Sequence, residues 1–519
     1  MQIDVEHPAI GREREIHRKR CLEDAGIVHE DVQGADLDLC GADEILERLG
    51  AREIPLDPVN RLPEVRDLLD VDRRDNRSLR GEPFGDRAAD AVGGAGDERD
   101  ATLEQAHPAT VEQRIVVASC SSFDMASVSM VRARNGCSRC SPVPAYPMRI
   151  TDVEPIVLRI DGLDATRADG MQDAFLVRVH TDEGIVGIGE ADTSPYVART
   201  IVEMPSSHSI ARGLREVLVG EDPLQTDRLW RLMFDASDHY GRGGAALHTI
   251  SAIDIALWDI AGKTAGRPVS ELLGGGQTRD VHVYASEVMP ETLDEVRRMA
   301  EHTVEAGYDA LKLGWGPLGQ DLAHDVALVG AARETLGPER TLMLDGGRAF
   351  TVKRALELLR RVEEHDLYWF EEPLPPDDLD GYRRLSDAAQ VRIAAGEADS
   401  TLRPFRALVE HGHVDVLQPD LARCGGFTVA REIASLERTT TVEIVPHCFS
   451  TGVLIAASLH FVATLDRPTW SEYSIADSPL VNGILSEPFA LRDGRLTVPA
   501  GPGLGINLDQ DAVDRVRLA

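Results

Sequence analysis

The most regular feature of the chain is an alternation of short apolar runs and amphipathic stretches, which begins near residue 280. The apolar runs fit buried strands, whereas stretches such as RALELLRRVEEH (354–365) carry helical periodicity. The strand candidates are VHVYAS (281–286), ALKLGW (310–315), TLMLDG (341–346), YWFEEP (368–373), RIAAGE (392–397), VLQPDL (416–421), EIVPHC (443–448) and TWSEYS (469–474). Eight strands that alternate with helices predict an α/β fold, a (β/α)8 TIM barrel, over residues 276–485.

The segment 148–275 has a mixed α+β pattern instead. MRITDVEPIVLRI (148–160) and AFLVRVHTDEGIVGIGEA (174–191) alternate like strands, and the turn Asp182-Glu183-Gly184 indicates a hairpin. ALHTISAIDIALWDIAGKTAG (246–266) carries the wide apolar face of a buried helix. Strand and turn signals over 486–519 predict a C-terminal segment that returns to this first domain.

The first 147 residues show weak periodicity, many breakers and few aromatic residues. Such a segment buries little apolar surface. Because the pattern changes abruptly at Met148, we interpret 1–147 as a poorly ordered or spurious N-terminal extension, and a small accessory domain is the alternative. The pair Cys137 and Cys140 has CxxC spacing, but without a second pair or a histidine partner it does not indicate a metal site.

The composition of the chain indicates which kinds of binding partner are unfavourable. The 519 residues carry a formal charge of −33 with 43% hydrophobic residues, which argues against nucleic acid and anionic membranes as partners. No apolar run looks long enough to span a membrane. No secretory leader is visible at Met1, so we expect a cytoplasmic protein. Nearly all positive charge is arginine, which a GC-rich genome explains as well as adaptation to high salt does.

Three carboxylates close successive strand candidates. Asp345, Glu371 and Glu397 are spaced by 26 residues each. The carboxyl ends of neighbouring barrel strands meet at one face, so we expect the three side chains to converge there. Oxygen ligands of this kind suit a hard cation, and Mg²⁺ is the natural candidate.

Four further polar residues accompany the other strand candidates, and together with the three carboxylates they form a recognisable order of motifs. Lys312 follows the second strand, Asp420 the sixth, His447 the seventh and Glu472 the eighth. The succession DGG, WFEEP, AAGE, QPDLARCGG, VPHCFSTG and SEYS resembles the mandelate racemase subgroup of the enolase superfamily, over residues 148 to about 510. This resemblance implies a modified (β/α)8 barrel closed by an α+β capping domain. It also implies that Asp345, Glu371 and Glu397 ligate Mg²⁺, and that Asp420 and His447 form a catalytic dyad.

The implied chemistry is removal of the proton next to a substrate carboxylate. This proton is weakly acidic, because its removal creates an enediolate dianion. A base working beside Mg²⁺ is the known solution in enolase-superfamily sites. His447 is the expected base, with Asp420 holding its tautomer, and Glu472 is expected to bind the substrate carboxylate.

One position departs from the family pattern. The second strand commonly ends Lys-x-Lys, with the second lysine acting as a base on the opposite face, but this chain has Lys312-Leu313-Gly314. A shifted alignment, which equates Lys312 with the second lysine, stays open. Racemisation needs two bases, whereas a dehydratase needs one base and an acid, which His447, Lys312 or Glu472 could supply.

We therefore expect a Mg²⁺-dependent dehydratase of a small sugar acid, an aldonate or aldarate, that forms a 2-keto-3-deoxy acid. A sugar-acid lactone cycloisomerase is the first alternative, a racemase or epimerase the next, and a non-catalytic barrel the alternative outside enzymes. Arg348, in DGGRAF, and Tyr196, in the cap loop 192–209, are candidate substrate contacts, and loop 161–173 is a second specificity candidate. By likeness to the family we expect a homo-oligomer.

Overall fold

The computed structural model describes residues 148–164, 171–275 and 279–518. The predicted extension 1–147, with Cys137 and Cys140, lies outside the described residues. So does the middle of the cap loop 161–173.

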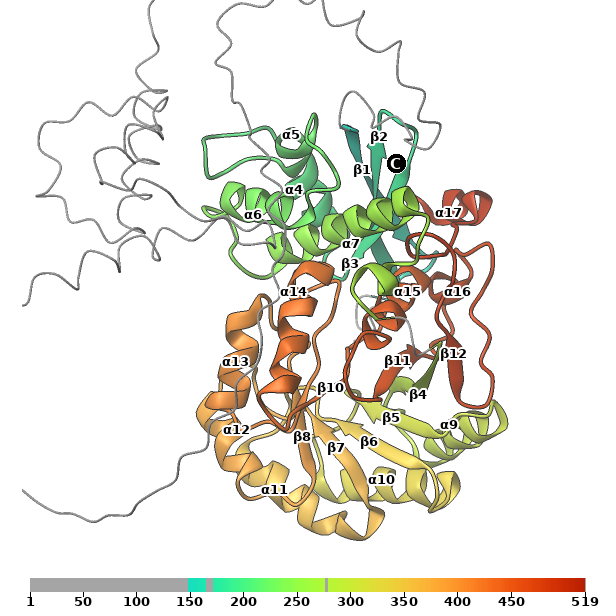
Figure 1. The fold of residues 1–519 in the computed structure, drawn as a ribbon. Helices are drawn as coiled ribbons and strands as arrows, with labels where there is room; N and C mark the ends of the chain where they lie inside the picture. Colours follow the sequence, from blue (N-terminus) through green and yellow to red (C-terminus); the bar gives the residue numbers. More distant parts are fainter. Residues whose placement is uncertain (1–147, 165–170, 276–278, 519) are drawn as a thin grey trace, which may run out of the picture. The chain divides into compact units, whose positions relative to one another are not determined.

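An antiparallel sheet with helices on it forms the first part (Figure 1). Its strands are β1 (Ile150–Arg159), β2 (Asp173–Thr181) and β3 (Val186–Ala191), in the order β1-β2-β3. The helices are α4 (Pro195–Glu203), α5 (Leu214–Leu218), α6 (Thr226–Ala236), α7 (Ala245–Ala265) and α8 (Val269–Leu272). The predicted hairpin is confirmed, since β2 and β3 pair from Phe175 with Ala191 to His180 with Val186.

Helix α7 packs directly on β3 because two glycines of the strand lack side chains. A Cβ atom at Gly189 would lie 1.9 Å from the carbonyl oxygen of Ala252, and one at Gly187 would lie 2.1 Å from that of Ala256. By length and composition α7 could cross a membrane, which the sequence analysis overlooked, but 83% of its apolar window is buried inside the protein. It is the core helix of this part.

The second part is the predicted barrel, and its eight strands are confirmed. They run parallel in the order β10-β9-β8-β7-β6-β5-β4-β11. Their bounds are β4 (Asp280–Val288), β5 (Ala310–Gly314), β6 (Thr341–Asp345), β7 (Leu367–Glu371), β8 (Arg392–Ala395), β9 (Val416–Leu417), β10 (Glu443–Ile444) and β11 (Trp470–Ser474). Strands β9 and β10 are shorter than expected, because Pro419 and Pro446 lack the N–H that continues a ladder.

Helices connect the strands and cover the outside of the barrel (Figure 1). They are α9 (Leu293–Glu305), α10 (Leu322–Leu336), α11 (Val352–Arg361), α12 (Leu379–Ser386), α13 (Leu402–Glu410), α14 (Gly426–Ala434) and α15 (Gly452–Val462). Six strands, and the residue that follows β10, each send one buried side chain into a shared cluster: Tyr284, Ala310, Met343, Trp369, Ala394, Val416 and Val445. This layer is packed with side chains, so a ligand site has to lie at an end of the barrel.

The C-terminal segment contacts both parts. It contains α16 (Pro479–Asn482), β12 (Arg495–Thr497) and α17 (Gln510–Val516). Strand β12 pairs antiparallel with β4 of the barrel, which the sequence analysis did not anticipate. The last described residue, Leu518, donates its N–H to the carbonyl of Val157 in β1. The domain boundaries remain predictions.

Two buried carboxylates join the cap to the barrel. Asp254 of α7 accepts hydrogen bonds from the N–H (3.0 Å) and hydroxyl (2.6 Å) of Thr428, near the start of α14. Glu190 of β3 accepts from Ser450, from Thr451 and from the N–H of Leu454, at the start of α15. Carboxylates are favourable there, since the first N–H groups of a helix lack partners within the helix. Helices α14 and α15 follow the segments that carry Asp420 and His447.

Candidate active site

The three carboxylates predicted to bind a metal lie together. Asp345 ends β6, Glu371 ends β7 and Glu397 follows β8, and all three are buried. One oxygen from each lies within 4.8 Å of the other two. Burial is the main reason that the pKa of Asp345 is raised to about 7 and that of Glu371 to about 8. Burial also acts to raise the pKa of Glu397, but the charges of His447 and Arg423 outweigh it, so this pKa is lowered instead. Three buried hard-oxygen donors, two of which resist ionisation, fit a divalent cation, which would offset the cost of burying their charge.

Nearby donors orient the first two of these carboxylates. Asp345 accepts the N–H of Gly347 at 2.8 Å and the indole N–H of Trp315 at 3.1 Å. Glu371 accepts the indole N–H of Trp369 at 3.1 Å and the amide of Gln418 at 2.7 Å, both through Oε2. Such contacts fix the direction of a ligand before an ion arrives.

Lys312 lies among the carboxylates. Its Nζ is 2.7 Å from Glu371 Oε1, 2.8 Å from Glu472 Oε1 and 3.9 Å from Asp345 Oδ2. Burial alone would lower the pKa of Lys312, but the charges of Glu371 and Glu472 hold it well above its usual value. The ammonium form of Lys312 is therefore favoured, and this form can donate hydrogen bonds or a proton.

Gly314 has a packing reason to be glycine. A Cβ atom at this position would lie 2.2 Å from Asp345 Cβ, a distance that real Cβ atoms do not show. The next residue, Trp315, has a left-handed backbone with φ 58°, and its indole reaches Asp345. Position 314, which the ungapped alignment equates with the family's second lysine, therefore has no room for a side chain on this backbone.

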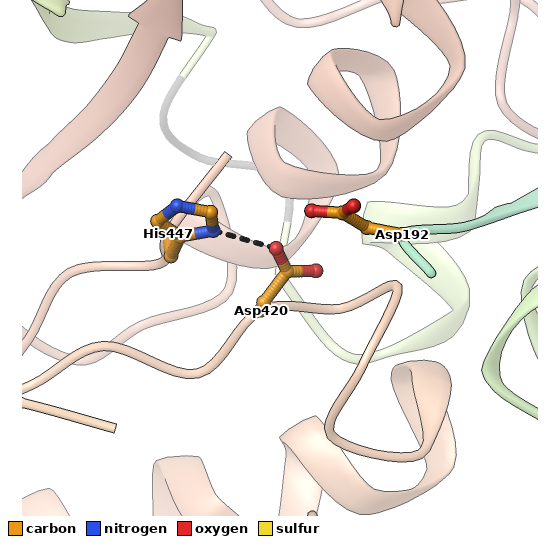
Figure 2. A group of neighbouring side chains, drawn as sticks. All are labelled: Asp192, Asp420 and His447. Atoms are coloured by element: carbon orange, nitrogen blue, oxygen red, sulfur yellow. Dashed lines mark hydrogen bonds and ion pairs between the residues drawn. The ribbon is translucent and has the colours of Figure 1, made fainter. Parts of the chain in front are cut away.

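Asp420 and His447 form the predicted pair. His447 Nδ1 is 2.6 Å from Asp420 Oδ2, and the other oxygen of Asp420 accepts the N–H of Ala422 at 2.6 Å. Figure 2 shows the imidazole directed at Asp420, with Asp192 of the cap on the far side of that carboxylate. With Nδ1 protonated toward Asp420, Nε2 is the nitrogen that faces the site.

The Nε2 atom of His447 lies 3.3 Å from Glu397 Oε2 and 3.9 Å from Glu472 Oε2. Burial acts to lower the pKa of His447, but the charges of Glu397 and Glu472 outweigh it and raise the pKa to about 10. Burial likewise acts to raise the pKa of Glu472, but Lys312 and His447 lower it to about 2. The carboxylate of Glu472 also accepts the N–H of Cys448 at 2.8 Å.

Of the two candidate substrate contacts, the structure brings one to the site. The Arg348 guanidinium donates to Glu372 at 2.7 Å and to Glu397 at 3.1 Å, and it lies 5.7 Å from the Trp315 ring. Tyr196 is 47% exposed on α4 and lies under Arg159. It does not belong to the lining of the cavity, because the start of α4 points it toward solvent.

These groups surround a cavity of about 230 Å³ at the carboxyl ends of the strands. Its lining comprises Asp192, Ser286, Glu287, Val288, Lys312, Gly314, Trp315, Asp345, Arg348, Glu397, Arg423, His447, Phe449 and Glu472. Sequence reasoning missed Asp192, Trp315 and Arg423. Arg423 stands inside the quoted QPDLARCGG run, three residues after Asp420, and Asp192 directly follows the predicted strand that ends at Ala191. Arg423 was within reach of a search for charges next to predicted site residues, and Asp192 is the first residue of the cap loop 192–209 that the sequence indicated without singling it out.

Comparison with known proteins places these features in a family. Residues 162–274 match the family described as mandelate racemase / muconate lactonizing enzyme, N-terminal domain, and residues 295–512 match the family described as enolase C-terminal domain-like. D-galactarolactone cycloisomerase from Agrobacterium fabrum is 35% identical over 66% of this chain and 91% of its own length. D-xylonate dehydratase from Haloferax volcanii is 31% identical over 72% of this chain and 95% of its own length.

Solved structures agree with the sequence matches. A racemase from Streptomyces coelicolor A3(2), crystallised with bound magnesium, superposes with a TM-score of 0.63 at 31% identity, covering 71% of this chain and all of that one. Cap, barrel and strand-end residues thus occur here in the combination expected from the sequence. The chain belongs to the mandelate racemase subgroup of the enolase superfamily.

Proposed function

We propose that this protein is a Mg²⁺-dependent dehydratase of a sugar acid, an aldonate or an aldarate. The observation that carries the proposal is the position of the His447–Asp420 pair beside Asp345, Glu371 and Glu397 in one cavity, with no room for a second base at Gly314. Relatives about 30% identical to this chain include named dehydratases of arabinonate, xylonate and gluconate.

His447 is the proposed base. Its Nε2 faces the cavity, while Asp420 keeps the proton on Nδ1. A Mg²⁺ ion held by Asp345, Glu371 and Glu397 would supply the charge that stabilises the anion formed from the substrate carboxylate. For this step His447 has to start as the neutral imidazole, and a Mg²⁺ ion at Glu397 would favour that form by offsetting the carboxylate charge that raises the pKa of His447. His447 then takes the proton from the carbon next to the substrate carboxylate and is left as the imidazolium, which Asp420 stabilises.

The second half of the reaction needs an acid for the departing hydroxyl. His447 holds a proton after the first step and can return it to the hydroxyl on the same face. Lys312 is the other candidate, because the charges of Glu371 and Glu472 keep its Nζ protonated. Loss of the β-hydroxyl as water leaves an enol, which becomes the 2-keto-3-deoxy acid.

A sugar-acid lactone cycloisomerase is the second candidate. The observation that favours it is the 35% identity with D-galactarolactone cycloisomerase. Ring opening of a lactone also starts with removal of one proton and needs no second base, so the geometry at Gly314 agrees with both reactions. We further propose a cytoplasmic location, from the sequence, and a homo-oligomeric assembly, from likeness to the family.

Purified protein should be incubated with Mg²⁺ and a panel of aldonates, aldarates and aldarolactones. Dehydration is read from 2-keto-3-deoxy acid trapped as its semicarbazone, and cycloisomerisation from loss of the lactone signals in the proton NMR spectrum. In D₂O the same spectra report exchange at the carbon next to the carboxylate. A panel without turnover or exchange would favour the non-catalytic barrel.

A further inference from the structure

The guanidinium of Arg423 lies between three carboxylates that come from separate parts of the chain. Asp192 follows β3 of the cap, Glu397 follows β8, and Asp420 follows β9. The side chain of Arg423 is 19% exposed, so solvent screens these charges little. Its position decides which of the three acids receives a positive charge.

The contacts of this guanidinium are unequal. Nη2 and Nε lie 2.5 and 3.1 Å from Asp192 Oδ2. Nη1 lies 3.4 Å from Glu397 Oε1 and 3.3 Å from the backbone oxygen of Glu397, and Nε lies 3.7 Å from Asp420 Oδ2. Hydrogen bonds to carboxylates are normally shorter than about 3 Å. Arg423 is therefore bound to the acid of the cap and only loosely to the two acids of the barrel.

The two loose contacts involve groups that the reaction needs. An arginine bound tightly to Glu397 would occupy an oxygen of a proposed metal ligand. One bound tightly to Asp420 would compete with His447 for Oδ2, the atom that accepts from Nδ1. Arg348 already donates to Glu397 Oε1 at 3.1 Å. Arginine–carboxylate pairs are strong when desolvated, so Arg423 would add a second tight contact to Glu397, or compete for Asp420, unless another acid held its guanidinium.

Asp192, Asp420 and His447 also form a group whose ligand atoms lie within 4.8 Å of one another (Figure 2). Arg423 lies close to both aspartates. Its charge offsets the repulsion between these two acids, so the group needs no second metal ion.

We propose that Asp192 is a positioning residue that acts through Arg423: it holds the guanidinium toward the cap, leaving Glu397 to bind the metal and Asp420 to bind His447. The part that concerns Glu397 rests on the proposed function. The cap thereby determines, through Arg423, where a positive charge lies at the barrel site.

The test compares D192N, R423Q and the double variant by calorimetric titration with Mg²⁺ alone. In D192N the released guanidinium binds Glu397, so the Kd for Mg²⁺ rises about tenfold. R423Q removes the competitor, so its Kd stays at or below that of the wild type. The double variant should have the same Kd as R423Q, since without Arg423 there is no guanidinium for residue 192 to hold. An unchanged Kd in D192N, or a weaker R423Q, overturns the proposal.

The chain offers a matched control pair. Arg431 of α14 and Asp227 of α6 also join barrel and cap, with Nη2 2.6 Å from Oδ1, but they are 44% and 66% exposed and lie outside the cavity lining. D227N and R431Q should leave the Kd within twofold. An equal effect of D227N would mean that loosening the cap, and not the release of Arg423, weakens binding. D192E keeps the negative charge, so its affinity for Mg²⁺ should be close to that of the wild type. If D192N does not fold, D192S is measured in its place.

A crystal structure of metal-free D192N separates this proposal from the proposed function. We expect a guanidinium nitrogen within about 3 Å of Glu397 Oε1 or Asp420 Oδ2. A guanidinium that keeps its distances of 3.4 Å to Glu397 Oε1 and 3.7 Å to Asp420 Oδ2, or that turns to solvent, overturns the proposed role of Asp192 even if Mg²⁺ binds. Absence of Mg²⁺ binding by the wild type would overturn the metal assignment, and the crystal structure would still decide the role of Asp192.

Discussion

The side chains around His447 determine its tautomer and its pKa. Asp420 fixes its Nδ1, and the acids around Nε2 favour its charged form. Another histidine of the described residues, His413, has different surroundings. His413 pairs with Asp387 at 2.8 Å, but it is 47% exposed and lies away from the carboxylate group.

His447→Asn should abolish turnover and α-proton exchange, with a loss of about 10²- to 10⁴-fold, because it removes the only base that this geometry equips. Binding of Mg²⁺ should persist, since the three carboxylates are unchanged. Exchange is measured by NMR in D₂O and binding by calorimetry. His413→Asn is the control for the loss of a His–Asp pair. Undiminished exchange in the His447 variant would show that another group is the base.

Gly314→Ala should weaken Mg²⁺ binding about 10- to 100-fold, because the new Cβ displaces Asp345. Gly314→Lys should do the same and should not create deuterium exchange on the face opposite His447. Calorimetry and the stereochemistry of exchange check the two statements. Gly243→Ala is the control, since no atom lies within 4 Å of a Cβ there. If the lysine variant racemised its substrate, position 314 would be able to hold a second base, and the packing argument would be wrong.

The sequence predicted the reacting residues of the site better than the residues that hold them. Asp345 and Glu371 end their strands, where the barrel rule directs a search. Lys312 and Glu472, which were expected after their strands, lie inside β5 and β11 instead, because these strands continue two residues beyond them. Asp192 and Arg423 are 231 residues apart, and nothing local links them. The contact of Trp315 with Asp345 depends on a left-handed backbone at Trp315. A bulky residue such as tryptophan rarely adopts this conformation, so the sequence does not predict it.

At the scale of elements, the helices behind the catalytic segments are anchored from outside the barrel. Helices α14 and α15 begin against Asp254 and Glu190, two acids of the cap. Burial raises the pKa of each to about 7, with the donor groups acting in the opposite direction. Strand order followed from the βα alternation, but these contacts did not, because a buried acid and a surface acid look alike in a sequence.

Glu190→Gln should lower the free energy of unfolding by about 1 to 3 kcal/mol, since the amide NH₂ faces groups that themselves donate hydrogen bonds. It should also change the pH dependence. Folded Glu190 keeps its proton up to about pH 7, whereas the unfolded side chain releases it near 4.5. The folded state therefore binds more protons in this window, and the contribution of Glu190 to stability falls as pH rises.

Urea unfolding at pH 5 and pH 7 measures both effects, and the wild type should lose more stability over this interval than the glutamine variant does. Glu216→Gln is the control, because this acid is exposed and its pKa is lowered, mainly through hydrogen bonds from Ser206. Parallel pH curves for the wild type and the Glu190 variant would mean that Glu190 is ionised in the folded protein throughout.

At the scale of the whole molecule, the chain carries a formal charge of −33, and much of the acid at the site is buried. A metal ion at the three carboxylates should therefore stabilise the folded protein as well as serve the reaction. At a concentration 100 times its Kd, a ligand of the folded state contributes about 2.7 kcal/mol.

Mg²⁺ should raise the melting temperature by several degrees, and EDTA should reverse the rise together with any turnover. Differential scanning calorimetry with KCl at matched ionic strength separates specific binding from screening of the net charge. Glu397→Gln, which removes one ligand charge, should show only the screening effect. A melting temperature that rises equally with both salts would argue against a specific site.

The buried contacts between cap and barrel bear on how this protein could be redesigned. Exchange of the cap for that of a relative looks like a simple way to change the substrate. Here, however, Asp254 and Glu190 complete two helices of the barrel, and Asp192 holds an arginine of the barrel. A transplanted cap without these acids would leave Thr428, Thr451 and Arg423 without their partners. A working chimera has to carry both residues of each contact. Cap and barrel therefore have to be exchanged together or matched at these positions.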